Sequence, residues 1–294
     1  MASKNFFFFL LFIAMIAWGG SWVNVKVMSG YVGAFDMIFI RYLLTSLSMV
    51  PLLFVLKKSF RIDVRGVGFV LASSAVLIAY MVYFFLGAKH GTASLGGALV
   101  TSLIPINTFL ILALMRARKV GRKNSVALTL GALGVLTMLN VWKFDLSQIL
   151  VIQNLYFLLA AILWPILTII SSKATHLSPV VFTFYMYVVV TIVVGLLFVD
   201  FNAIAYEKLD GIFWTNTFLM AFAATTFANT VYFLGIERLG AGEVSSFIFL
   251  VPFSAIGLSA LFLDEVISLS MIVGVLMTLY AVKLLNNITF FKKR

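Results

Sequence analysis

The sequence predicts an all-α integral membrane protein, with ten transmembrane helices arranged as two inverted repeats of five helices each. The composition, the length of the apolar segments and a repeated order of landmarks support this prediction. Hydrophobic residues make up 63% of the 294 residues and charged residues 11%, and the mean hydropathy is +1.13. Soluble domains are nearer to half apolar and a quarter charged, so the composition indicates a membrane protein.

Apolar segments of about 20 residues follow one another with short polar breaks, and each is long enough to cross a hydrocarbon core of about 30 Å as a helix. The alternating segments of about ten residues that a transmembrane barrel needs are absent from the sequence. The expected helices cover residues 6–28, 34–56, 66–88, 92–115, 124–141, 152–172, 179–199, 212–236, 243–263 and 268–289.

Similar segments occur in the same order in both halves of the chain. The matching segments are Ala14–Gly19 with Ala160–Pro165, Tyr83–Gly87 with Val231–Gly235, and Leu103–Pro105 with Leu250–Pro252. We therefore expect a first repeat at residues 1–141 and a second at residues 142–294. Because five is odd, the second repeat enters the membrane in the opposite sense. Inverted repeats of this kind are typical of transporters that bind substrate between the copies and work by alternating access.

The basic residues predict the orientation. If the N-terminus is cytoplasmic, the basic connections, such as 57–65 and 116–123, face the cytoplasm, and the outer side receives Lys89, Lys143 and Lys208. The positive-inside rule then places both termini in the cytoplasm. The net charge of +11 is explained by this topology and by contact with lipid headgroups, so we expect no nucleic-acid partner.

Several side chains near the centres of the predicted helices end in a polar group, which needs a partner in hydrocarbon. Trp18 and Trp164 occupy corresponding positions in the two repeats. We expect these side chains either to bind substrate in a central aromatic-lined cavity or to pack and hydrogen bond between helices. The candidate substrate-binding residues are Trp18, Trp22, Tyr80, Tyr83, Thr101, Trp164, Asn229 and Tyr232.

Arg41 lies about two turns into the second predicted helix, where a cation is costly unless it is paired or hydrated. It is a candidate contact for a substrate anion. The favoured alternatives are that it reaches the outer surface or pairs with Asp36. Pro105 and Pro252 are also repeat mates near the membrane centre, where a proline bends a helix, so they are candidate hinges, with ordinary packing as the alternative.

The order of these motifs resembles the drug/metabolite transporter superfamily, specifically the ten-helix carriers built from two EamA-type repeats. The segments that support the resemblance are Ala17–Ser21, Phe39–Tyr42, Gly87–Ala98 with Pro105, Leu234–Ala241 with Pro252, and Leu263–Glu265 with Gly274. The resemblance implies a multi-pass carrier of small metabolites in the cell inner membrane, often an exporter. Two complete repeats are enough for a working monomer.

Within this class we expect a carrier for amino acids, including aromatic ones, or for similar amphipathic metabolites. The alternatives are a transporter of quaternary ammonium or other cationic compounds, held over aromatic faces, and a lipid-carrier flippase. No acidic residue lies in the middle of a predicted helix, which favours a facilitator or exchanger over a proton-coupled carrier.

An enzyme is not expected. The sequence lacks paired carboxylates, a histidine cluster and a phosphate-binding loop, so we assign no catalytic residue. The chain also contains no cysteine. We therefore expect no metal site and no cofactor.

Overall fold

The structure is a computed structural model of the chain, and it describes residues 4–116, 121–143, 150–174, 177–239 and 246–286. These residues form helices and no strand, as predicted. The first five helices of the chain are α1 (Lys4–Met28), α2 (Ala34–Val55), α3 (Val64–His90), α4 (Ala93–Leu114) and α5 (Arg122–Met138), and the short 3₁₀ helix η1 (Val141–Lys143) follows.

The second half repeats this series. Its first two helices are α7 (Ile152–Ser172) and α8 (Pro179–Leu197), and a short 3₁₀ turn, η2 (Tyr206–Lys208), precedes the third. The third helix is continuous and consists of α9 (Gly211–Phe218), η3 (Leu219–Phe227) and α10 (Ala228–Leu239). The last two are η4 (Ser246–Phe249) with α12 (Leu250–Leu263), and α13 (Leu269–Asn286). All ten predicted helices are therefore present, and the first part of the predicted helix 243–263 lies outside the described residues.

Six of the described helices are long and apolar enough to cross a membrane by length and composition: α1, α2, α3, α4, α7 and α8. The helices α12 and α13 are apolar but shorter. Several helices begin where the sequence provides a capping side chain. Asp63, Thr92 and Asp210 each accept a hydrogen bond from the backbone N–H three residues further on, which satisfies one of the free donors of a helix N-terminus.

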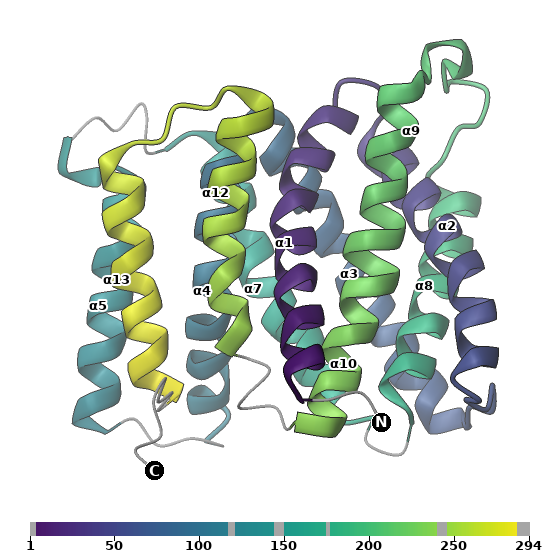
Figure 1. Cartoon of the computed structure of the whole chain (residues 1–294), viewed down its shortest axis with the longest axis horizontal. Coiled ribbons are helices and arrows are strands. Elements are labelled where there is room, and N and C mark those ends of the chain that lie inside the picture. The colour runs from purple at the N-terminus through teal and green to yellow at the C-terminus, as the bar shows by residue number, and fades with distance from the viewer. Residues whose placement is uncertain (1–3, 117–120, 144–149, 175–176, 240–245, 287–294) are drawn as a thin grey trace.

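The two repeats run through the bundle in opposite directions. In Figure 1, α1 begins and α13 ends on the side that also carries the connection between α2 and α3, residues 56–63. We call this side the basic face and the other side the opposite face. Because the first repeat has an odd number of helices, α1 to α5, α7 runs from the opposite face to the basic face, antiparallel to α1, as the prediction of inverted repeats requires.

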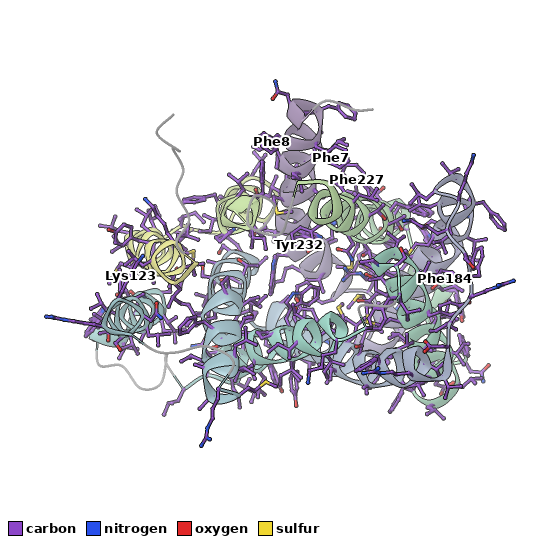
Figure 2. The ribbon with its side chains drawn as sticks, turned by 90° about the horizontal axis from the view of Figure 1, so that it is seen from below. Phe7, Phe8, Lys123, Phe184, Phe227 and Tyr232 are labelled. Carbon is purple, nitrogen blue, oxygen red and sulfur yellow. The ribbon has the colours of Figure 1, made fainter. Side chains whose placement is uncertain are left out.

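The most extensive helix packing joins one repeat to the other. The leading pairs are α5 with α13, α3 with α7, α1 with α12, and α2 with α8. Seen from the basic face, α1 lies between α12 and α10, both of which belong to the second repeat (Figure 2). The core of the protein is thus mostly an interface between the repeats, and side chains at the centre of the bundle meet partners from the other repeat.

Two helices depart from a regular α-helix. The segment η3 is a π-helix, and the hydroxyls of Thr225 and Thr226 donate to carbonyls five residues earlier, at 2.8 and 3.1 Å. The segment η4 is a 3₁₀ turn that ends shortly before Pro252. Proline lacks an N–H and its ring crowds the carbonyl four residues earlier, which explains why a regular α-helix does not extend through this region.

The helices α5 and α13 approach each other closely at two glycines. A Cβ atom added at Gly274 would lie 2.6 Å from the carbonyl oxygen of Gly134, and one added at Gly134 would lie 2.8 Å from the carbonyl oxygen of Gly274. Backbone atoms cannot move away as a flexible side chain can. Small residues at such positions allow the close backbone contact that stabilises helix pairs in membranes.

We predict that Gly274→Ala separates α13 from α5 and lowers the free energy of unfolding by about 1–3 kcal/mol, the usual effect of overpacking. The matched control is Gly257→Ala in α12, where an added Cβ has no atom within 4 Å. There, the higher helix propensity of alanine should leave stability unchanged or raise it by up to about 1 kcal/mol. The measurement is unfolding of the purified protein in detergent. Equal stability of the two variants would contradict the packing assigned to Gly274.

Candidate functional site

Trp18 connects the two repeats near the centre of the bundle. Its indole N–H lies 3.0 Å from the side-chain oxygen of Asn229 in α10 and 3.0 Å from the carbonyl oxygen of Ala224 in η3. One donor is therefore shared between two acceptors, both from the second repeat. The ring of Trp18 also packs against Tyr232, with centroids 5.1 Å apart. In Figure 2, Tyr232 lies on the side of α10 that faces the middle of the molecule.

The side-chain amide of Asn229 continues this connection. Its nitrogen donates to the hydroxyl of Tyr187 in α8, and the ring of Tyr187 stacks on Tyr42 of α2 at a centroid distance of 5.0 Å. Asn229 therefore uses both ends of its amide, one toward α1 and the other toward α8. Both tyrosine rings are buried.

Arg41 is buried beside this stack, with 9% of its surface exposed. Its Nε and Nη2 atoms lie 3.1 and 2.9 Å from the hydroxyl oxygen of Thr225, and Nη1 lies 3.7 Å from the sulfur of Met81. Asp36, which we considered as a partner, instead accepts a hydrogen bond from the backbone N–H of Gly33. Within the described residues, none of the hydrogen bonds of Arg41 goes to a carboxylate.

Further polar contacts join α2 to the π-helix η3. The hydroxyl of Thr45 lies 3.3 Å from the carbonyl oxygen of Ala221, and the hydroxyls of Ser48 and Thr226 are 2.6 Å apart. The π-helix therefore presents the carbonyl oxygen of Ala221 and two threonine hydroxyls to α2. π-Helical segments are rare and occur often at functional sites.

The second predicted tryptophan, Trp164, lies on the other side of this region. Its ring is 4.8 Å from that of Tyr80 in α3, and Tyr80 is stacked on Phe84 at 5.9 Å. Tyr80 directly precedes Met81, whose sulfur lies 3.7 Å from Nη1 of Arg41. Most of these residues lie near the middle of their helices, and Arg41 and Tyr42 contact residues that do. We call them the midplane cluster: Trp18, Arg41, Tyr42, Tyr80, Trp164, Tyr187, Thr225 and Asn229.

Trp22, also predicted to bind substrate, is a packing residue in this structure. It is 2% exposed, and its ring meets Phe84 edge-on at 4.3 Å and Phe157 at 6.0 Å. A Cβ on Gly96 would lie 2.6 Å from the Trp22 ring, so α4 approaches this indole with no room for a side chain. Trp22 therefore fills the space between helices on the opposite-face side of Trp18.

Two other candidates lie apart from the midplane cluster. Tyr83 stacks on Tyr156 at a centroid distance of 6.0 Å, and the hydroxyl of Thr101 donates to the carbonyl oxygen of Gly97 within its own helix. Neither contact brings them to Arg41 or Trp18. Two members of the cluster, Tyr42 and Tyr187, were not predicted from the sequence. Two features of the sequence could have indicated them: Tyr42 directly follows Arg41, and Tyr187 is near the centre of its predicted helix.

The sequence matches the model of the EamA-like transporter family twice, over residues 5–140 and 151–287. The chain belongs to the EamA-like transporter family. No curated protein matches it. A solved crystal structure superposes on it with a TM-score of 0.63 and 14% sequence identity, covering 96% of both chains, which supports the shared fold.

The two EamA matches divide the midplane cluster between the repeats. Trp18, Arg41, Tyr42 and Tyr80 belong to the first match, and Trp164, Tyr187, Thr225 and Asn229 belong to the second. Both hydrogen bonds donated by the indole of Trp18, and the hydrogen bond from Arg41 to Thr225, join a residue of the first match to a residue of the second. The corresponding tryptophans have different roles, since Trp18 donates hydrogen bonds and Trp164 makes a ring contact.

The two predicted hinge prolines differ in their surroundings. Pro105 lies inside the continuous helix α4, whereas Pro252 lies in the first turn of α12, directly after η4. The first turn of a helix tolerates proline because its N–H has no partner there. Pro252 thus marks a helix boundary and Pro105 an interruption of hydrogen bonding within a helix. The assignment of both as hinges stays a prediction.

Two charged residues hold the opposite face together. The carboxylate of Glu265 accepts hydrogen bonds from the backbone N–H groups of Ala93 and Ser94, at 2.7 and 2.8 Å. Lys26 donates to the carbonyl oxygens of Lys89 and Gly91, at 3.0 and 2.6 Å. We call Lys26, Glu265 and the connection 89–94 the terminal clamp. An anion at a helix N-terminus and a cation at a helix C-terminus are both favourable, so the clamp joins α1 and the α12–α13 connection to α3 and α4.

We predict that Trp18 and Asn229 are energetically coupled. In a double-mutant cycle with Trp18→Phe and Asn229→Leu, the coupling in unfolding free energy should be about 0.6–1.7 kcal/mol, the range for interhelical hydrogen bonds in membranes. Trp18→Phe combined with the exposed Trp142→Phe provides the control cycle, whose coupling should be near zero. A coupling near zero in the first cycle as well would contradict the hydrogen bond.

We also predict that Glu265→Gln loosens the terminal clamp. Because the chain has no cysteine, Ser94→Cys places a single thiol at a position that is 1% exposed. Glutamine has one acceptor oxygen and no charge, so at least one N–H of α4 loses its partner, and labelling of the thiol by a maleimide should accelerate several-fold. Asp264→Asn, at the exposed neighbouring position, is the control. Equal labelling rates in the two variants would show that Glu265 does not hold α4.

Proposed function

We propose that this EamA protein moves amino acids, including aromatic ones, or similar small amphipathic metabolites by alternating access. The proposed direction is export, and the proposed mode is facilitated diffusion or exchange. The proposal includes insertion as a monomer in the cell inner membrane with the basic face in the cytoplasm. The observation that supports it most strongly is the midplane cluster, in which polar groups of one repeat find their partners in the other.

Alternating access needs the repeats to move against each other at the depth of the membrane centre. The midplane cluster lies at this depth, so such a movement would break the bonds of Trp18 and Arg41 to the second repeat. A substrate with polar groups can supply replacement partners during the movement. In the structure the same donors are satisfied internally, by Asn229, Ala224 and Thr225.

The exposure of the aromatic rings supports a role in binding for part of the cluster. In the midplane cluster, Trp18 and Trp164 are half-buried, as is Tyr232, which packs on Trp18, whereas the stacked pair Tyr42 and Tyr187 is buried. Half-buried indole and phenol rings offer flat apolar faces with a polar edge, which suits an amphipathic molecule with an apolar or aromatic side chain. The same faces would also suit a quaternary ammonium group, which is the main alternative substrate.

The distribution of acidic residues supports a facilitator or exchanger. No acidic residue occupies the central turns of a predicted span, and proton-coupled carriers use such residues as relays. Two of the carboxylates at the opposite face, Asp210 and Glu265, are engaged with helix N-termini. Donation by the Phe213 backbone N–H and the Tyr31 hydroxyl holds the pKa of Asp210 below its usual range, so it stays charged at neutral pH.

Counterflow in proteoliposomes tests the proposal. Purified protein is reconstituted without an ion gradient and challenged with amino acids, choline-like cations, nucleobases and sugar phosphates. We expect saturable exchange of amphipathic amino acids, reduced at least about tenfold by Trp18→Ala or Trp164→Ala because each variant removes a large aromatic contact. The matched control is Trp142→Ala, because Trp142 is exposed and does not belong to the midplane cluster. This variant should keep full exchange.

Exchange of cations alone would replace the amino-acid proposal by the quaternary ammonium alternative. Lipid that copurifies and scrambles between leaflets, with no exchange of any soluble compound, would support the flippase alternative. Exchange that is insensitive to both cluster tryptophans would contradict the placement of the substrate at the midplane cluster.

A further inference from the structure

We propose that the edge of Arg41 formed by Nε and Nη2 binds a carboxylate of the transported molecule, in place of the hydroxyl of Thr225. This inference deepens the proposed function and rests on it, because it names the charge that the substrate brings to the midplane cluster. It also selects among the substrate classes, since a cation would be repelled from this position.

The first argument is the unbalanced charge. Arginine stays protonated in proteins, and Arg41 is more than nine-tenths buried near the membrane centre. The groups around it within the described residues are neutral: the hydroxyl of Thr225, the thioether of Met81 and the ring of Tyr42, whose centroid is 5.4 Å away. A buried cation at this depth is costly without a countercharge, and the described protein supplies none at hydrogen-bond distance.

The second argument is the geometry of the guanidinium. Nε and Nη2 are the two parallel donors that bind a carboxylate with two oxygens. Here both converge on the single oxygen of Thr225, at 3.1 and 2.9 Å. One neutral oxygen shared by two charged donors is a weaker match than a carboxylate, which brings two oxygens and the opposite charge. The third nitrogen, Nη1, meets only sulfur, a weak acceptor.

The third argument is the position of Thr225. Its hydroxyl donates to the carbonyl oxygen of Met220 while it accepts from Arg41, so the π-helix η3 holds it in place. It lies one residue from Ala224, an acceptor of Trp18, and one turn from Asn229. A carboxylate that displaces Thr225 from Arg41 would therefore remove one of the polar contacts between α2 and η3 and leave those of Thr45 and Ser48. The anion site would thus link substrate binding to the contact between the repeats.

Three ligands that share one phenyl ring test the inference: 3-phenylpropanoate, its uncharged amide, and 3-phenylpropylamine. Binding to the purified protein is measured by ligand-dependent thermal stabilisation in detergent. We expect the carboxylate to bind at least about tenfold more tightly than the amide, as for a hydrogen bond to a charged group, and the amine to bind most weakly. Arg41→Gln should reduce the ratio of carboxylate to amide affinity to about one.

Thr225→Val separates a binding role from a structural one. Valine has nearly the shape of threonine but removes the internal competitor of the substrate. If Thr225 only stands in for a carboxylate, Thr225→Val keeps or raises the affinity for 3-phenylpropanoate, in contrast to Arg41→Gln. If Arg41 and Thr225 form a purely structural pair, both variants lower the affinity for all three ligands alike, and the inference is wrong.

The inference and the proposed function fail in different ways. Equal binding of the acid and the amide to the native protein contradicts the anion site and leaves an aromatic carrier in place. Absence of binding by all three ligands contradicts the aromatic substrate, and acetate alone is then used in the same assay. Stabilisation of the native protein, but not of Arg41→Gln, by acetate supports the anion site, and equal responses overturn it.

Discussion

The indole N–H of Trp18 needs a hydrogen-bond acceptor because no water is available in the hydrocarbon core of a membrane, and its acceptors belong to the other repeat. The same requirement applies to the guanidinium of Arg41, whose bonds to Thr225 also cross between the repeats. Polar satisfaction at the membrane centre therefore fixes how the two repeats face each other. The hydrophobic effect does not favour one arrangement of the helices, because lipid tails are as apolar as the helix surfaces.

The π-helix follows from this constraint. A regular α-helix uses its own N–H groups to satisfy its carbonyls, whereas η3 offers the carbonyl oxygens of Ala221 and Ala224 to side chains of α2 and α1. Its threonines compensate for the altered backbone bonding by donating to carbonyls five residues earlier. The terminal clamp solves a similar problem at the opposite face, where Glu265 satisfies two N–H groups of α4. Both sites join the repeats through hydrogen bonds between a side chain of one repeat and backbone groups of the other.

The sequence was sufficient to predict the helices, the duplication and part of the cluster, because these depend on local hydropathy and on residue type. The sequence indicated Trp18, Trp164 and Asn229 because a side chain with a polar group needs a partner in the middle of an apolar helix. The packing of Trp22 was not predictable, because it depends on Phe157 and Gly96 from other helices. The π-helix was not predictable either, since the sequence 219–227 is apolar like an ordinary helix and its distortion depends on acceptors required by α1 and α2.

If the protein works by alternating access, as proposed, the charge of the midplane cluster helps it to avoid a stable closed state. Neutral hydrogen bonds such as that of Trp18 can be exchanged for equivalent bonds to a substrate with little change in free energy. Arg41 differs, because its internal partner is neutral and a carboxylate would be better. In the proposed mechanism, the guanidinium of Arg41 has a neutral partner within the protein, and a substrate carboxylate would replace it with a better one. Differential interaction of this kind is what allows a ligand to shift a conformational equilibrium, since a ligand that binds both states equally shifts nothing.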